Sequence, residues 1–291
     1  MKIAAVQMDV TLGDVDGNLG RMLDKFAETR KQGAELTIFP ECALTGYCFD
    51  SAEEALPYAQ PIESPRAAPR GTPSAIERFS SACRELGGFA LFGLLEPDGR
   101  GGVFNAAALV GAEAIIGSYR KVHLPYLGID RYVSYGDRPF QVHDVGGVRL
   151  GVGICYDSAF PEASRTMALA GADLIALPTN FPSGAECMAE HVVNVRAMEN
   201  GVYFAAVNRV GTERGFTFIG RSRICAPSGE TLAAASKTDE EVLYAEIDVE
   251  KARTKRVVRR PGHEIDRLAD RRPEMYAALV EPHSLPRSGG R

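Results

Sequence analysis

The sequence contains no tryptophan, no Cys-x-x-Cys pair and no long apolar run. No stretch approaches the roughly 18 apolar residues of a transmembrane helix, so we expect no membrane span. Six cysteines and five histidines are scattered along the chain, which argues against a zinc site. Residues 1–9 lack the apolar core of a secretory signal and are interpreted as a first strand. Free thiols and a cytoplasmic location are therefore expected.

Neither sign of charge dominates the chain as a whole. It carries 33 Lys and Arg residues against 38 Asp and Glu, a formal net charge of −5, so wholesale affinity for nucleic acid is not expected. Residues 251–291 depart from this balance, with eleven basic side chains against five acidic ones. We expect this basic C-terminal extension to pack on the acidic body or on a sister subunit, with binding of an anionic partner as the alternative.

The 291 residues, 45% of them hydrophobic, suffice for one large core, and residues 1–250 are predicted to form one domain. Many nearly all-apolar strands with few helices between them favour an α/β fold in which two sheets pack face to face, with helices outside. Five prolines from residue 57 to residue 73 predict an irregular segment at 50–73. Helices are predicted at 18–31, 74–86, 161–170 and 185–200, and strands at 3–8, 36–39, 89–95, 103–110, 114–119, 148–154, 174–177, 202–208, 216–219, 221–225 and 242–247.

Cys155 directly follows an apolar strand and precedes a helix that is predicted to begin at Pro161. A thiol at such a strand–turn–helix junction is exposed at the end of the strand, where it can act as a nucleophile. The backbone N–H of Tyr156 can donate to an oxyanion that develops there. The alternative is a small buried hydrophobic side chain, the usual fate of a free cysteine.

Glu41 and Lys121 each follow another apolar run. Desolvation at the end of its strand is expected to raise the pKa of Glu41 toward that of a general base. Alternation along a strand puts Arg120 and Lys121 on opposite faces, so one of them can point into a cleft and stabilise an oxyanion. The alternative for Glu41 is a solvated carboxylate in a loop, and the alternative for Lys121 is a solvated basic edge after a strand. Taken together with Cys155, the residues predict a base, a charge stabiliser and a nucleophile.

The segments around these three residues, in this order, resemble the nitrilase superfamily of carbon–nitrogen hydrolases, whose chemistry depends on a Glu–Lys–Cys triad. The resemblance spans roughly residues 1–250. It lies in a glutamate block (39–41 and 44–47), a lysine block (119–125), a nucleophile block (153–157 and 160–162) and the further segments 177–180, 196–200 and 220–222.

This resemblance implies a four-layer αββα sandwich, no metal or organic cofactor, and subunits that pair as a homodimer or higher homo-oligomer. It also implies that Cys155 attacks the carbonyl carbon of a small-molecule amide while Glu41 takes the thiol proton. Lys121 and the Tyr156 N–H would hold the oxyanion, and the resulting thioester would then be hydrolysed with Glu41 activating water.

One position departs from the pattern of the superfamily. Many members have a second glutamate after the lysine, whereas residues 126–132 contain none. Asp130 is the nearest carboxylate and would support the site with a shorter side chain. The alternative is that Asp130 pairs with Arg131 or Arg138 at the surface.

The substrate branch depends on a few residues near the cysteine. Branches that hydrolyse N-carbamoyl amino acids place an arginine where this chain has Ser158 and Ala159. Nitrilases proper often have Cys-Trp-Glu, whereas residues 155–157 are more like amidases. We expect hydrolysis of a neutral or hydrophobic carboxamide to a carboxylic acid and ammonia or an amine. The alternatives are a nitrilase or N-carbamoyl amide hydrolase, or a catalytically silent binding partner. Pocket-lining candidates, each of which is alternatively ordinary packing, are Tyr47, Tyr126, Asn180 and Phe181.

Overall fold

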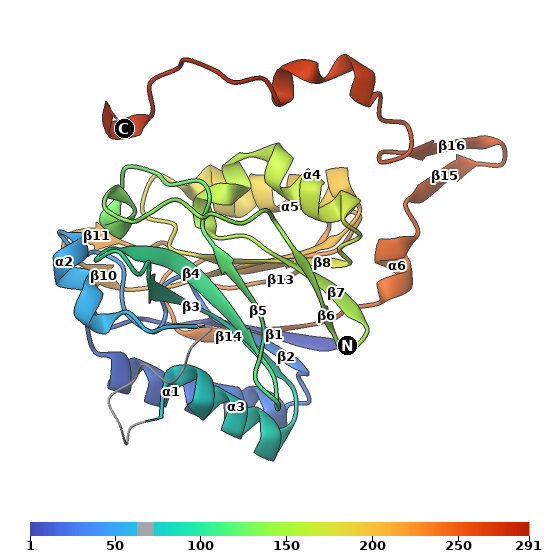
Figure 1. Cartoon of the computed structure of the whole chain (residues 1–291). Helices are drawn as coiled ribbons and strands as arrows, with labels where there is room; N and C mark the ends of the chain where they lie inside the picture. The colour runs from blue at the N-terminus through green and yellow to red at the C-terminus, as the bar shows by residue number, and fades with distance from the viewer. Residues whose placement is uncertain (63–72, 291) are drawn as a thin grey trace.

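The computed structural model describes residues 1–62 and 73–290 and shows four layers, in which two six-stranded sheets pack face to face between helices (Figure 1). The predicted αββα sandwich is thereby confirmed. The first sheet contains, in spatial order, β14 (Glu241–Glu246), β1 (Lys2–Gln7), β2 (Leu36–Ile38), β3 (Phe89–Pro97), β4 (Val103–Val110) and β5 (Ile115–Arg120). The second contains β13 (Thr231–Ala234), β12 (Arg223–Cys225), β9 (Tyr203–Asn208), β8 (Leu174–Thr179), β7 (Val148–Val152) and β6 (Val142–Val145).

The central strands are buried on both faces. All eight residues of β4 and all six residues of β8 and of β9 are buried. Strands covered on both sides appear in a sequence as continuous apolar runs, which is why these three were predictable. Between the sheets, Leu36 and Leu91 of the first sheet belong to the same apolar cluster as Leu150 and Leu174 of the second.

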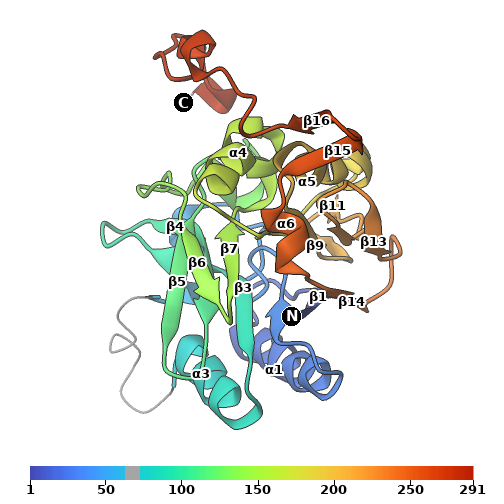
Figure 2. The same ribbon diagram turned by 90° about the vertical axis from the view of Figure 1, so that its right-hand side faces the viewer.

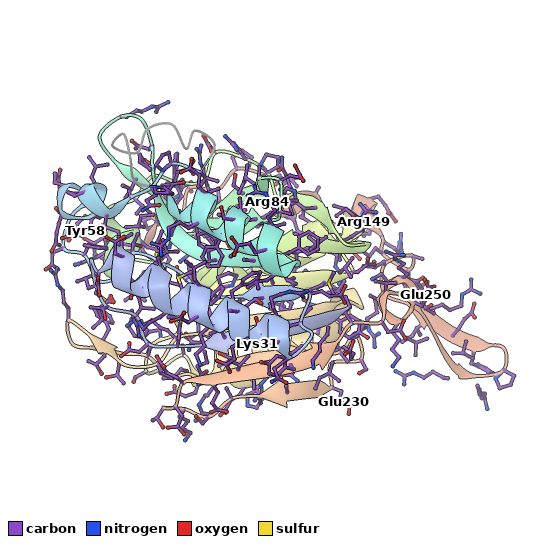
Figure 3. The ribbon with its side chains drawn as sticks, turned by 90° about the horizontal axis from the view of Figure 1, so that it is seen from below. Lys31, Tyr58, Arg84, Arg149, Glu230 and Glu250 are labelled. Atoms are coloured by element: carbon purple, nitrogen blue, oxygen red, sulfur yellow. The ribbon has the colours of Figure 1, made fainter. Side chains whose placement is uncertain are left out.

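Two pairs of helices form the outer layers. The helices α1 (Val15–Lys31) and α3 (Ala75–Leu86) lie side by side over the first sheet, and Figure 3 shows them from below with Lys31 and Arg84 near their ends. The helices α4 (Pro161–Leu169) and α5 (Val193–Asn200) cover the second sheet (Figure 1). Ser74 begins α3 with a capping box to Glu77, as its sequence position predicts.

Three local predictions need correction. The predicted helix at 185–200 contains a π-helical turn, Met188–Val192, before α5. The irregular segment predicted at 50–73 is wrong in its first part, because the Ser51 side chain caps the short helix α2 (Ala52–Ala55), and a 3₁₀ turn follows at Leu56–Tyr58. Residues 63–72 of that segment lie outside the described residues. The strand predicted at 216–219 is shorter in the structure, β11 (Phe216–Thr217), and pairs with β10 (Thr212–Glu213). The sequence did not predict β10 or the short, partly exposed edge strands β6 and β13.

Parallel strands at the centre of each sheet position the candidate reactive residues. The strands β1, β2 and β3 are parallel in the first sheet, as are β7, β8 and β9 in the second. Glu41 follows β2, Cys155 follows β7 and Asn180 follows β8. Residues at the carboxyl ends of parallel strands collect at one edge of a sheet, where α/β folds bind their ligands.

The C-terminal extension leaves the sandwich after β14. It contains α6 (Val249–Arg253), a hairpin of β15 (Arg256–Arg260) and β16 (His263–Asp266), and an arm with three 3₁₀ turns. The hairpin projects from the body on the right of Figure 1, and Figure 2 shows it from the side that then faces the viewer. The turns span Pro273–Met275, Ala277–Leu279 and Ser288–Gly290. The apolar side chains of this arm are unusually exposed, 66% for Met275 and 86% for Val280. None of the helices in the described part of the chain is long and apolar enough to cross a membrane.

Candidate active site

Glu41 lies in a loop that is fastened to the neighbouring strand β3. The N–H of Phe39 donates to the carbonyl of Leu91 (2.8 Å), and the N–H of Gly93 donates to the carbonyl of Pro40 (3.1 Å). A side chain at Gly93 would place its Cβ 2.7 Å from the Glu41 Cα, so only glycine allows this close approach of the two backbones. The Glu41 side chain is completely buried.

Lys121, directly after β5, is also buried and joins two carboxylates. Its Nζ lies 2.6 Å from Glu41 Oε1 and 2.6 Å from Asp130 Oδ2. Asp130, in the 3₁₀ turn Gly128–Arg131, is fully buried rather than at the surface. The structure therefore places Asp130 against Lys121, where it can hold the ammonium group.

Asn105 of β4 connects the two carboxylates and was missed by the sequence reasoning. Its Nδ2 donates to Glu41 Oε1 (2.7 Å) and to Asp130 Oδ1 (2.9 Å). The Tyr47 hydroxyl donates to Asp130 Oδ2 (2.9 Å) and completes this buried network. A single amide side chain inside a strand of otherwise apolar, fully buried residues was a signal that could have identified Asn105.

Cys155 begins a 3₁₀ turn, Cys155–Ala159, with a left-handed backbone conformation of φ 45°. A non-glycine residue with positive φ is strained and is held there by its surroundings. Asp157 supplies much of that support, since its Oδ2 accepts from the Ile154 N–H (2.8 Å) and from the Tyr119 hydroxyl (2.7 Å). Its Oδ1 lies 2.7 Å from His123 Nδ1, so the lysine and nucleophile blocks are joined behind the thiol.

Burial and charge determine the protonation of the three candidate catalytic groups. Burial raises the pKa of Glu41, although Lys121 opposes the shift. Burial works against the charged form of Lys121, but Asp130 and Glu41 outweigh it, and its pKa is raised well above the ordinary value. Burial and the Glu41 charge raise the pKa of Cys155, whereas Lys121 lowers it. The raised pKa of Cys155 favours the neutral thiol, so attack by its sulfur requires a base.

Cys155 opens into a cavity of about 450 Å³ with mostly apolar walls. Four of the predicted pocket residues, Tyr47, Tyr156, Asn180 and Phe181, line it. Tyr126 is not among its lining residues and is 49% exposed. Further walls, which sequence reasoning did not identify, come from Pro125, Leu127, Ala159, Pro182, Ser183, Gly184, Ala185, Met188, Phe216 and Phe218.

Two buried side chains of the candidate site, Glu41 and the cavity-lining Asn180, retain unused hydrogen-bonding capacity among the described residues. Glu41 Oε2 and both amide atoms of Asn180 have no hydrogen-bond partner there. Asn180 is only 2% exposed, so these atoms are cut off from bulk solvent. Buried polar atoms are normally paired, and an amide bound in the cavity, with a carbonyl acceptor and an N–H donor, could pair with both amide atoms of Asn180.

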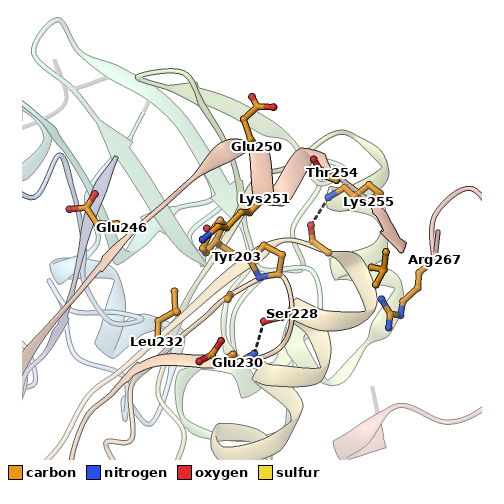
Figure 4. A pocket seen from close by; sticks show the side chains of 14 residues that line it. Tyr203, Ser228, Glu230, Leu232, Glu246, Glu250, Lys251, Thr254, Lys255 and Arg267 are labelled. Carbon is orange, nitrogen blue, oxygen red and sulfur yellow. Dashed lines mark hydrogen bonds between the residues drawn. The ribbon is translucent and has the colours of Figure 1, made fainter. Parts of the chain in front are cut away.

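A larger cavity, of about 610 Å³, lies at the other end of α5 and contains none of the candidate catalytic residues (Figure 4). Figure 4 shows Lys255 pointing toward the end of this helix, and its Nζ donates to the carbonyl of Gly201 (2.6 Å). Lys255 therefore acts as a C-terminal cap for α5. The mixed acidic and basic walls of this cavity offer no set of groups comparable with that at Cys155.

Comparison with known proteins extends over almost the whole chain. A model of the carbon-nitrogen hydrolase family matches residues 2–257. A nitrilase of Pyrococcus abyssi is 40% identical over 276 residues, which cover 95% of this chain and 99% of that protein. An N-carbamoylputrescine amidase of Solanum lycopersicum is 32% identical over 299 residues, which cover 96% and 94%.

Solved structures give the same result. A cysteine-to-alanine mutant of an amidase from Nesterenkonia AN1, of the nitrilase superfamily, matches with a TM-score of 0.78 and 26% identity. The match covers 96% of this chain and 97% of that chain. The chain therefore belongs to the carbon–nitrogen hydrolase family. Within that family it is an amidase-type hydrolase of the nitrilase superfamily, as the motif blocks predict.

Proposed function

We propose that this enzyme hydrolyses a neutral, largely apolar carboxamide through a thioester on Cys155, with Glu41 as base and Lys121 as charge stabiliser. The observation that carries this proposal is the buried contact of Lys121 with Glu41 and Asp130, next to a thiol that opens into a cavity. Glu41 keeps one oxygen without a partner among the described residues, and this oxygen is available for a proton.

In the first half of the reaction, Glu41 accepts the proton of the Cys155 thiol as the sulfur bonds to the carbonyl carbon. The carbonyl π electrons move to oxygen, and Lys121 and the Tyr156 N–H stabilise the oxyanion. When the carbonyl re-forms, the C–N bond breaks, and the proton on Glu41 passes to the departing nitrogen. Ammonia or an amine leaves, and the acyl group remains as a thioester.

In the second half, water replaces the amine. Glu41 takes a proton from the water as the water oxygen bonds to the thioester carbon. Lys121 and the Tyr156 N–H stabilise the second oxyanion. The C–S bond then breaks, the sulfur recovers the proton from Glu41, and the carboxylic acid leaves. In this proposal Asp130 keeps Lys121 charged and oriented but exchanges no proton.

The cavity walls support a neutral substrate. The described residues that line it include no Lys, Arg, Asp or Glu, so none of them would form an ion pair with a substrate carboxylate or ammonium group. The side-chain amide of Asn180 has no partner among the described residues, so it is the group best suited to fix the orientation of the substrate. One structure of the Nesterenkonia amidase shows covalent addition of the acetamide moiety of fluoroacetamide at its active-site cysteine, which supports a nucleophilic role for Cys155 here.

We also propose that the C-terminal extension packs on a sister subunit in a homodimer or higher homo-oligomer. Its arm exposes apolar side chains that a lone chain leaves in water, including Leu279 at 61% and Leu285 at 73%. A truncated protein ending at residue 250 should then change its mass in light scattering by more than the lost segment accounts for. A cytoplasmic location stays a prediction from the sequence.

The function is tested by intact mass spectrometry of a Glu41→Gln variant mixed with amides, nitriles and N-carbamoyl compounds. Loss of the base should slow deacylation, so an adduct on Cys155 identifies the acyl group by its mass. Cys155→Ala is the control and should give no adduct. Adducts from nitriles alone would replace the amidase assignment by a nitrilase. Absence of both adduct and ammonia release, with wild type as well, would favour either a narrow substrate outside this set of compounds or a catalytically silent binding partner. Activity that survives a chelator would support the predicted absence of a metal.

A further inference from the structure

Arg209 is among the largest fully buried side chains of the described chain and lies outside the proposed reaction. It follows β9 and donates to Glu213 Oε1 (2.6 Å), Asp9 Oδ1 (2.8 Å) and the carbonyl of Val10 (2.7 Å). Its guanidinium also stacks on the Phe218 ring, 4.3 Å from the centroid. A buried guanidinium with this many partners has a fixed position.

Glu213, in β10, uses its second oxygen on a distant part of the chain. Its Oε2 accepts from the backbone N–H groups of Tyr47 (2.9 Å) and Cys48 (2.7 Å). The Glu213 side chain is 4% exposed, so these are charge-assisted hydrogen bonds away from water. We call Arg209 and Glu213 together the clamp. It ties the second half of the chain to the loop that carries Glu41.

Tyr47 is the residue through which the clamp reaches the proposed site. Its hydroxyl donates to Asp130 Oδ2 (2.9 Å), the atom that also lies 2.6 Å from Lys121 Nζ. Its carbonyl accepts from the N–H of Ile129 (2.9 Å), and its ring lines the cavity beside Phe218. The hydroxyl also lies 3.1 Å from the carbonyl oxygen of Leu127. Residues 127–130 thus hold the hydroxyl and the carbonyl of Tyr47, and Glu213 holds its N–H.

We infer that the clamp is a positioning unit, in which Glu213 holds the backbone of Tyr47 so that the Tyr47 hydroxyl keeps Asp130, and through it Lys121, in place. This inference rests on the proposed function, because it assigns a catalytic effect to residues that touch no substrate. A purely structural ion pair would stabilise the fold without any coupling to the Tyr47 hydroxyl. If the clamp positions Tyr47, the effects on kcat of substitutions at Glu213 and at the Tyr47 hydroxyl should instead be coupled.

The test is a double-mutant cycle on kcat with Glu213→Gln and Tyr47→Phe in the full chain, using an amide that wild type hydrolyses. Glu213→Gln keeps the size of the side chain but cannot accept from Arg209 and from both N–H groups at once. We expect it to lower kcat about tenfold to a hundredfold, since small displacements far from the reacting atoms have effects of this size. The double variant should lose little more than the worse single variant, because both changes break one connection.

Asp173→Asn is the matched control. Asp173 is 2% exposed, and its Oδ2 accepts from Arg253 Nη2 (2.8 Å) and from the Arg149 N–H (3.0 Å), at the far ends of β7 and β8. This variant removes a similar carboxylate and should change kcat less than twofold, with losses that multiply independently when combined with Tyr47→Phe. Multiplicative losses for Glu213→Gln, or an unchanged kcat in the folded variant, would overturn the clamp.

Two further measurements keep the test decisive. If Glu213→Gln does not fold, Glu213→Asp retains the charge with a shorter reach and enters the same cycle. If wild type hydrolyses none of the amides, the proposed function fails, and the cycle is read instead from the rate at which iodoacetamide alkylates Cys155, followed by peptide mass spectrometry. If Glu213→Gln and Tyr47→Phe together slow alkylation little more than the slower single variant, the clamp is still supported. If the two decreases in rate multiply, the clamp is overturned.

Discussion

Two buried clusters, each containing positive and negative side chains, contact Tyr47. They differ in how completely their polar atoms are hydrogen-bonded. The reactive cluster of Glu41, Lys121 and Asp130 leaves Glu41 Oε2 without a partner in the described chain. In the clamp, both oxygens of Glu213 and the guanidinium of Arg209 are bonded. Both groups are cut off from water, so their different pairing reflects different tasks.

The contrast shows how burial serves chemistry in one place and order in the other. A buried carboxylate with an unused oxygen has a raised affinity for protons, which suits a base. A buried carboxylate that is fully hydrogen-bonded is fixed in position and is costly to remove. Replacement of Glu by Gln is therefore expected to affect mainly activity at Glu41 and stability at Glu213. The variants below test this difference.

The largest expected effect is that of Glu41→Gln. Loss of the base should lower kcat about a thousandfold, within the range for general bases. Burial disfavours the ionised form of Glu41, so its replacement by a neutral side chain should change the free energy of unfolding little. Glu213→Gln should instead cost about 3 kcal/mol of unfolding free energy, because it leaves buried groups unpaired. Steady-state rates and denaturant unfolding of both variants measure the difference, and equal losses of stability would contradict it.

Lys121→Met should have the next largest effect. It removes the cation between Glu41 and Asp130, so two buried carboxylates then face each other without a positive partner. We expect kcat to fall about a hundredfold because the oxyanion loses its stabiliser. The unfolding free energy should also fall, by about 3 kcal/mol, as for other broken buried ion pairs. Activity retained above a tenth of wild type would exclude Lys121 as the charge stabiliser.

Gly128→Ala is expected to have an intermediate effect by disturbing Tyr47 directly. Gly128 has a φ of 47°, and a Cβ there would collide with Cε1 of the Tyr47 ring. We expect kcat to fall about tenfold as the ring and its hydroxyl are displaced. Gly33→Ala is the matched control, since Gly33 also has a positive φ, of 82°, but a Cβ there meets no atom within 4 Å. An equal fall in both variants would assign the loss to backbone strain alone.

The smallest expected effect is a shift in pH dependence. Glu41 has to be ionised to take the thiol proton, and burial raises its pKa. Activity should therefore be full above that raised pKa and decline as the pH falls through it, at a higher pH than an ordinary carboxyl group would show. The charge of Asp130 contributes to the raised pKa of Glu41, so Asp130→Asn should move this acid limb to lower pH.

Profiles of kcat/KM against pH for wild type and Asp130→Asn measure this shift. Asp173→Asn is the control and should leave the limb in place, because Asp173 lies at the far ends of β7 and β8 and pairs with Arg253. If the pH at which kcat/KM declines on the acid side is also unchanged in Asp130→Asn, Asp130 does not influence the pKa of Glu41.

The elements that could be predicted from the sequence are those with strong local patterns. The helix over Ala75–Leu86 has its capping serine, and the strand over Val103–Val110 is a continuous apolar run, so both are confirmed almost to the residue. The strands β6 and β13 lie at the two edges of the second sheet and are partly exposed, so they lack the continuous buried apolar pattern of the central strands. The π-helical turn Met188–Val192 has no sequence signature, because it depends on packing.

The candidate site divides in the same way. Glu41, Lys121 and Cys155 stand in motifs whose residues are adjacent in the sequence, so the sequence by itself determined the family and the type of chemistry. Whether Asp130 lies at the surface or against Lys121 was open until the fold was seen. Contacts such as Glu213 with the Tyr47 N–H join residues 166 positions apart. Only the tertiary structure decided these, because burial and hydrogen-bond geometry at such separations depend on how the two sheets pack, and no local pattern encodes that.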